Sequence, residues 1–224
     1  MGAGASNICY MTAMTKFAVL LGGDVTSTKR LKRQLEGASV LAADSGIAHA
    51  ATLKLSPLLW VGDFDSSTAE HQETYAHIPR QTFSTEKDAT DGELAISEAL
   101  RRGATSLILV GGFGGQFDHT MAHVGFMLAL TRRDIPVFMT SGHEEAHVLI
   151  NDLEFDDIAI GTRLSVVPVS ELKALTLVGV KWPLNRRDVP LGSALTLSNI
   201  VTGPVDIELK FGTALVVFYP RELD

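Results

Sequence analysis

The chain has 224 residues with a formal net charge of −7, and 46% of its residues are hydrophobic. This length suits one large domain or two small ones, and the composition supports a full core, which argues against disorder. The acidic balance argues against general nucleic-acid binding, which requires a basic surface.

The cysteine content and the hydropathy of the sequence indicate in which cellular compartment the protein is expected. The one cysteine, Cys9, leaves no intramolecular disulfide and no cysteine zinc site, which fits a reducing compartment. No apolar run reaches the roughly 18 residues of a membrane span. We therefore expect a cytoplasmic protein with no membrane segment and no nucleic-acid partner.

Strand-like and helix-like segments alternate along the first part of the chain. Apolar runs lie at 17–21, 39–43, 58–61, 106–110 and 136–139, with a weaker one at 81–84. Helix-like stretches lie between them at 28–36, 46–53, 68–77, 91–102 and 119–132. Such alternation is typical of βαβ units with a mainly parallel sheet. We predict an α/β, Rossmann-like domain over residues 15–142.

The pattern changes after about residue 142. Short β-rich runs follow at 146–150, 163–169, 174–180, 194–197, 205–210 and 213–219, separated by Gly and Pro. No strong helical period is present. This part predicts an antiparallel β-sandwich or barrel domain over residues 146–224.

Chemically distinctive residues follow the predicted parallel strands. Asp44 comes after 39–43, Asp63 after 58–61, and a glycine-rich segment, 111–115, after 106–110. In open parallel sheets ligands bind beyond the carboxyl ends of the strands, so these segments should share one acidic cavity. Carboxylate clusters hold hard cations such as Mg²⁺, which mostly serves phosphates.

Asp63 and Asp65 are two residues apart and can meet one metal from a turn. Alternatively, Asp63 caps a helix that begins near Ser67. The preceding glycine and the neighbouring acids favour the metal interpretation. Asp88 and Asp91 open the next helix, where acids also complement the helix dipole, so both interpretations stay open there.

Lys87 can neutralise this acidic cluster or reach a phosphate. The glycine-rich segment leads into Asp118, His119 and Thr120 at a helix start, where backbone N–H groups can approach an anion. It is neither a Walker A loop nor a Rossmann fingerprint. A wide turn is the alternative, and the position of the segment favours a phosphate or nucleotide loop.

Three polar or aromatic residues stand out in the second part. Trp182 can be a core or interface aromatic, or it can offer a flat face to an aromatic or cationic ligand. Ser198 and Asn199 can bind a ligand or simply form a turn.

Taken together, these residues resemble the thiamin pyrophosphokinase family. The carrying segments occur in the family's order at 43–46, 62–66, 88–93, 112–120, 181–184 and 198–199. The resemblance implies an α/β domain, a β-sandwich-like domain, and a homodimer with active sites between subunits. It also implies transfer of the pyrophosphoryl group of ATP to the hydroxyl of thiamine, giving thiamine diphosphate and AMP.

Roles for individual residues follow from the resemblance by motif position. It implies that Asp63, Asp65 and Asp91 coordinate Mg²⁺. From the placement of the carboxylates we expect Asp88 or Asp91 to accept the hydroxyl proton. The resemblance implies nucleotide contacts from the segments that hold Asp44, Ser45, Gly112, Gly114, Gly115, Asp118, His119 and Thr120. Lys87 is added as a nucleotide contact because of its charge and its place before the acidic cluster. The resemblance implies thiamine contacts from Trp182, Ser198 and Asn199 of the partner subunit.

Two residues depart from the family pattern. Ser45 stands where the family commonly has glycine, and Gln116 stands where it often has arginine, which removes a charged bidentate phosphate contact. Two rival functions remain: a Mg²⁺-dependent phosphohydrolase and a non-catalytic nucleotide-sensing module.

Overall fold

The computed structural model describes residues 15–64, 67–82 and 89–221. Its first half is built on six parallel strands, in the spatial order β4-β3-β2-β1-β5-β6. These strands are β1 (Lys16–Leu20), β2 (Ser39–Ala43), β3 (Leu59–Gly62), β4 (Arg80–Thr82), β5 (Ser106–Val110) and β6 (Val137–Thr140). The predicted parallel sheet is therefore confirmed.

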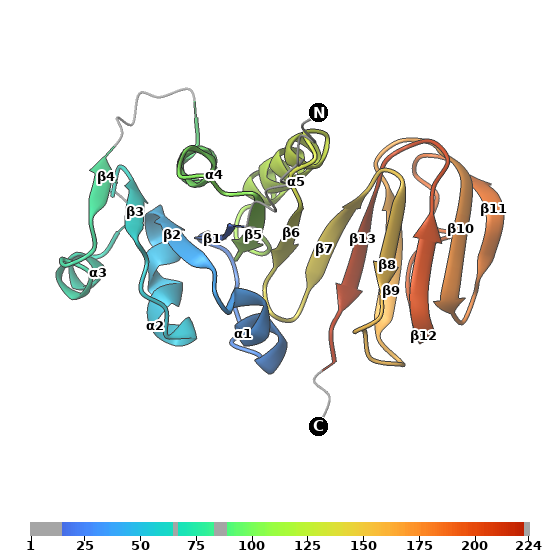
Figure 1. The fold of residues 1–224 in the computed structure, drawn as a ribbon, viewed down its shortest axis with the longest axis horizontal. Helices are drawn as coiled ribbons and strands as arrows, with labels where there is room; N and C mark the ends of the chain where they lie inside the picture. Colours follow the sequence, from blue (N-terminus) through green and yellow to red (C-terminus); the bar gives the residue numbers. More distant parts are fainter. Residues whose placement is uncertain (1–14, 65–66, 83–88, 222–224) are drawn as a thin grey trace, which may run out of the picture.

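Helices cover both faces of this parallel sheet (Figure 1). They are α1 (Lys29–Leu35), the 3-10 helix η1 (Asp44–Ala48), α2 (His49–Leu53), α3 (Ala69–Thr74), α4 (Asp91–Arg101) and α5 (Phe117–Thr131). α4 and α5 bury apolar residues such as Ala95 and Met127 in one core. α1, η1 and α2 bury Leu31, Ile47 and Ala50 in a second core on the other face.

Threonine hydroxyls begin three of the helices. Thr28, Thr68 and Thr90 accept hydrogen bonds from the backbone N–H groups three residues later, at 3.1, 3.2 and 3.2 Å. Each hydroxyl satisfies one of the N–H groups that a helix start leaves unpaired. α3 therefore begins after Thr68, and the alternative that Asp63 caps this helix is wrong.

The second half of the chain extends the same path of hydrogen-bonded strands with antiparallel neighbours. β7 (Glu145–Leu149) pairs with β6, and the order continues through β13 (Ala214–Tyr219), β9 (Arg163–Pro168), β12 (Asn199–Glu208), β10 (Leu172–Val180) and β11 (Leu184–Val189). β8 (Asp152–Phe155) pairs with β12. Figure 1 shows this half without helices. The fold is thus mixed α/β on one large sheet.

One strand links the buried cores of the two halves. In β7, Val148 belongs to the core under α4 and α5, whereas Leu149 belongs to the core of the antiparallel half. Successive residues of a strand point to opposite faces, so one strand serves both cores. A division into domains at residues 15–142 and 146–224 stays a prediction.

The strands of the second half differ from prediction at several places, and β12 begins at Asn199, before the predicted run at 205–210. The expected strand at 194–197 is wrong, because Leu197 N–H bonds back to Ala194 at 3.2 Å in a turn and Leu195 is 55% exposed. β8 and β11 are not predicted, because their exposed residues are polar and their sequences therefore contain no apolar run. Within the described ranges, no helix is long and apolar enough to span a membrane.

Candidate active site

A cavity of about 390 Å³ lies beyond the carboxyl ends of β1, β2 and β5. β2, which follows β1 in the sequence, lies on one side of β1, and β5 lies on its other side. The strand order therefore runs in opposite directions on the two sides of β1. Such switch points are where open α/β sheets bind ligands. Four segments line the cavity: 21–23, 43–45, 90–92 and parts of 111–123. As predicted from the sequence, Asp44 and the glycine-rich segment share one cavity, but Asp63 does not line it.

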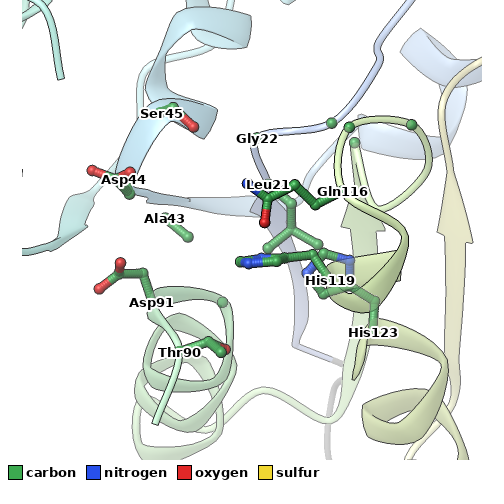
Figure 2. Close-up of a pocket in the computed structure, with 15 residues that line it drawn as sticks. Leu21, Gly22, Ala43, Asp44, Ser45, Thr90, Asp91, Gln116, His119 and His123 are labelled. Carbon is green, nitrogen blue, oxygen red and sulfur yellow. The ribbon is translucent and has the colours of Figure 1, made fainter. Parts of the chain in front are cut away.

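Asp44 and Asp91 bring carboxylates to one side of this cavity. Figure 2 shows them opposite Gln116 and His119. Asp91 is the first residue of α4, directly after the Thr90 cap. The helix start thus determines where this carboxylate stands.

The Asp63 turn lies against Asp44. A Cβ added at Gly62 would come within 3.3 Å of Asp44 Cα, so glycine permits this close approach. Ser67 Oγ donates a hydrogen bond of 3.4 Å to Asp44 Oδ1 from the segment beyond the turn. Asp63 itself is half-buried and does not line the cavity.

The predicted metal ligands are only partly within the described residues. Asp65, Lys87 and Asp88 lie outside them. Among the residues that are described, no three His, Cys, Asp or Glu side chains form a group able to hold a metal. The set of Asp63, Asp65 and Asp91 therefore stays a prediction. By donor chemistry the site suits Mg²⁺, which takes carboxylate oxygens.

The glycine-rich loop is packed backbone-to-backbone against the segment after β1. Gly23 N–H donates to Gly111 O at 2.8 Å, and Asp24 N–H donates to Phe113 O at 2.7 Å. Gly114 has φ +74, and a Cβ there would clash with the carboxylate of Asp24. The glycines therefore allow the loop to pack closely on the preceding segment and leave no side chains in the cavity at these positions.

The predicted nucleotide residues divide into two groups. Those that line the cavity are Asp44, Ser45, Gly114, Gly115 and His119. Those that do not are Gly112, Asp118 and Thr120. Asp118 instead accepts a hydrogen bond from His119 N–H at 2.9 Å, and the Thr120 hydroxyl donates to Gly114 O at 3.4 Å. These contacts shape the loop and the start of α5.

Several residues of the cavity wall are not among the predicted site residues. Gly22 and Gly23 follow the first apolar run, so the rule that placed Asp44 applies to them as well. His123 is on α5, one turn after His119, and a lone histidine in a helix carries no comparable sequence signal. Gln116, noted as a departure, also lines the cavity.

The cavity wall carries little positive charge. Among the described residues that line it there is no Lys or Arg, and its ionisable side chains are Asp44, Asp91, His119 and His123. Burial lowers the pKa of His123, which favours its neutral form. The side chains that line the cavity therefore supply little positive charge for an anionic ligand.

Trp182 and Asn199 are joined to each other, away from this cavity. Asn199 Oδ1 accepts from Trp182 N–H at 3.1 Å, and Asn199 Nδ2 donates to Trp182 O at 2.8 Å. The Trp182 ring is 55% exposed, with Lys181 Nζ 4.8 Å from its centre. Ser198 lines a separate cavity of about 350 Å³. Within one chain, none of the three lines the cavity that holds Asp44 and Asp91.

Sheet register nevertheless places these residues near the same edge of the sheet. Thr140 of β6 pairs with Glu145, Glu145 with Phe218, Phe218 with Leu164, and Leu164 with Asn199. This row starts at the carboxyl end of the parallel strands. Asn199 and the attached Trp182 thus lie at the carboxyl edge, several strands from the aspartates.

Two family models match successive parts of the chain. The catalytic domain of thiamin pyrophosphokinase matches residues 31–139, and its vitamin B1 binding domain matches residues 150–216. The chain belongs to the thiamin pyrophosphokinase family. The thiamin pyrophosphokinase catalytic match contains Asp44, Asp63 and Asp91, and the vitamin B1 match contains Trp182 and Asn199.

Individual thiamin pyrophosphokinases resemble this member over most of its length. The thiamine pyrophosphokinase of Bacillus subtilis is 28% identical over 167 residues, which cover 71% of this chain and 76% of that protein. A crystal structure of the B. subtilis protein matches with a TM-score of 0.80 at 22% identity, covering 93% of this chain and all of that one. Thiamin pyrophosphokinase from Candida albicans matches with a TM-score of 0.76 at 14% identity, covering 93% and 90%.

Proposed function

We propose that the chain is a thiamine diphosphokinase, which transfers the pyrophosphoryl group of ATP to the hydroxyl of thiamine. The products are thiamine diphosphate and AMP. The observation that carries this proposal is the presence of both family models on one chain, with the carboxylate cavity inside the catalytic match. The B. subtilis relative, matched over most of the chain, carries the name of this activity.

In the proposed reaction the thiamine hydroxyl oxygen attacks the β-phosphorus of ATP. The bond from that phosphorus to the oxygen shared with the α-phosphate breaks, and AMP leaves. Asp88 or Asp91 accepts the hydroxyl proton. Transfers of this kind depend mainly on positioning and on charge stabilisation, so the protein's main task is to align the two substrates.

The cavity wall supplies groups for ATP. Backbone N–H groups of the loop through Gly114, Gly115 and Gln116 would meet phosphate oxygens at the start of α5, where a helix favours negative charge. Asp63, Asp65 and Asp91 would hold Mg²⁺. When bound, this ion neutralises negative charge on the phosphates.

The proposed thiamine site uses the second half of the chain. Trp182 would stack on the aminopyrimidine ring with Ser198 beside it, and Asn199 would hold Trp182 in place through its two hydrogen bonds. The carboxylates suit the cationic thiazolium ring.

We further propose a cytoplasmic homodimer with active sites between subunits. Each site would join the carboxylate cavity of one chain to Trp182 of its partner, which accounts for their separation within one chain. The proposed domains, 15–142 and 146–224, then supply the nucleotide and thiamine sides. A phosphohydrolase or a nucleotide sensor leaves the vitamin B1 binding match unexplained.

Product analysis tests the proposed function. The purified chain is incubated with ATP, Mg²⁺ and thiamine, and AMP and thiamine diphosphate are quantified over time. We expect both products in equal amounts, and neither when thiamine or Mg²⁺ is omitted. Formation of ADP or inorganic phosphate, or ATP binding without turnover, would contradict the proposal.

A further inference from the structure

His123 is a buried histidine to which the proposed reaction gives no role. It lies on α5, is 8% exposed, and forms part of the wall of the carboxylate cavity. Its neighbour on the same helix face, His119, is exposed, with ring centres 6.5 Å apart. Figure 2 shows both rings on the α5 side of the cavity.

The hydrogen bond of His123 determines which ring nitrogen carries the proton. Nδ1 lies 3.1 Å from the carbonyl oxygen of Gly112, an atom that can only accept. Nδ1 is therefore the donor, and in the neutral ring Nε2 is unprotonated. The imidazole thus contacts the first part of the glycine-rich loop through the carbonyl of Gly112.

The other side of the ring faces the start of α4. A Cβ built at Gly92 would lie 3.5 Å from His123 Nε2 and 3.1 Å from Leu21 Cδ2. A Cβ at residue 92 would thus be in ordinary van der Waals contact with the imidazole and would press on the methyl group of Leu21. Gly92 directly follows Asp91, so the ring stands between the glycine-rich loop and the helical turn that carries this carboxylate.

We propose that His123 is a positioning residue that holds the glycine-rich loop at a set distance from Asp91. This inference rests on the proposed function, in which the loop and Asp91 act on the same ATP molecule. Displacing reacting groups by about 1 Å can cost on the order of a hundredfold in rate, so a rigid spacer at this point matters. A histidine that only filled the core would leave ATP kinetics unchanged when replaced by a residue of similar volume.

Three substitutions of His123 distinguish the contribution of Nδ1 from that of Nε2. In His123→Asn the amide nitrogen can occupy the place of Nδ1 and donate to Gly112. In His123→Gln the amide reaches instead to the place of Nε2, and His123→Leu offers no donor. We expect kcat/KM for ATP to fall on the order of a hundredfold in the Leu and Gln variants. The Asn variant should stay within about tenfold of the wild type, whereas the KM for thiamine should change little in all three.

Controls keep the test independent of folding and of the proposed function. His77→Leu replaces an exposed histidine outside the cavity and should match the wild type. Circular dichroism checks each fold, and if the Leu variant does not fold, the comparison of Asn with Gln decides. The Kd of Mg-ATP, from equilibrium dialysis without thiamine, should weaken at least tenfold in Gln and Leu but not in Asn.

The outcomes distinguish two separate failures. If the wild type makes no thiamine diphosphate, the proposed function fails, and the Kd values alone decide the role of His123. Equal Kd values for Mg-ATP across the folded variants would overturn that role. A normal Kd in the Gln variant together with a weakened one in the Asn variant would overturn it as well.

Discussion

The indole Nε1 of Trp60 donates a hydrogen bond of 2.8 Å to the backbone carbonyl of Asp44. Trp60 is fully buried in β3, and Asp44 has φ 42, in the left-handed region. That conformation is unfavourable for a residue with a Cβ, so surrounding contacts must hold it. A buried side chain of one strand thus positions the carboxylate that follows the neighbouring strand.

Trp60→Phe keeps an aromatic ring but removes this donor. We expect the free energy of unfolding to fall by about 1–3 kcal/mol, because a partly buried carbonyl loses its partner and side-chain volume is lost from the core. Turnover should also fall, because Asp44 is less well held. Urea unfolding and steady-state kinetics measure both effects. Trp182→Phe, at an exposed position, should leave stability unchanged.

Asp91→Asn tests the proposed metal site. Removing one carboxylate charge should lower turnover on the order of a hundredfold and raise the Mg²⁺ concentration needed for half-maximal rate. Asp65→Ala, outside the described residues, should act in the same direction. Asp152→Asn, at an exposed position on β8, is the matched control. An unchanged Mg²⁺ titration for Asp91→Asn would remove this residue from the metal site.

Trp182→Ala tests the thiamine side. We expect the KM for thiamine to rise on the order of tenfold, because a stacking surface is lost, while the KM for ATP stays constant. Asn199→Ala should raise the thiamine KM too, because Trp182 then loses both hydrogen bonds that hold its backbone. Phe211→Ala, another exposed aromatic, is the control. A normal thiamine KM would make Trp182 a surface residue without this role.

Mixing two impaired variants, at a thiamine concentration well below the KM, tests for active sites between subunits. Asp91→Asn and Trp182→Ala damage different halves of the proposed site, so a mixed dimer keeps one intact site. Random exchange of subunits should restore about a quarter of wild-type activity, as expected for a two-fold symmetric dimer. Analytical ultracentrifugation should show a dimer. No recovery after proven subunit exchange would indicate that each site lies within one chain.

Glu98→Gln tests an ion pair on α4. Hydrogen bonds from Arg101 at 2.7 Å, together with Arg102, lower the pKa of the buried Glu98 carboxyl from 4.5 to about 2. Because the folded-state pKa is the lower one, this stabilisation is complete above about pH 4.5 and is lost as the pH falls towards 2. The partly exposed arginines limit its size to about 1 kcal/mol at neutral pH.

Urea unfolding of the wild type and of Glu98→Gln across this pH range measures the effect. The difference in the free energy of unfolding should shrink steadily as the pH falls from 4.5 to 2, whereas Glu154→Gln, at an exposed position, should show no difference at any pH. A constant difference would mean that the ionised form of Glu98 is not what stabilises α4.

The parallel half of the fold was predictable because its signals are local and strong. Residues 39–43 and 106–110 are each a serine followed by four apolar residues, and both form strands with these bounds. β11 has the sequence Leu-Asn-Arg-Arg-Asp-Val and lies at the end of the strand order. Such an edge strand needs few apolar residues, so its sequence resembles a loop.

By itself, the sequence determined which chemical groups are available: carboxylates and glycines after parallel strands, a tryptophan in the second half, and an ordered set of motifs that marks the family. Only the tertiary structure decided which groups meet. His123 reaches Gly112 across 11 positions, and Asn199 reaches Trp182 across 17. Residue types specify what a side chain can bind, but strand order and register decide what lies within its reach, because these contacts form only once the chain is packed.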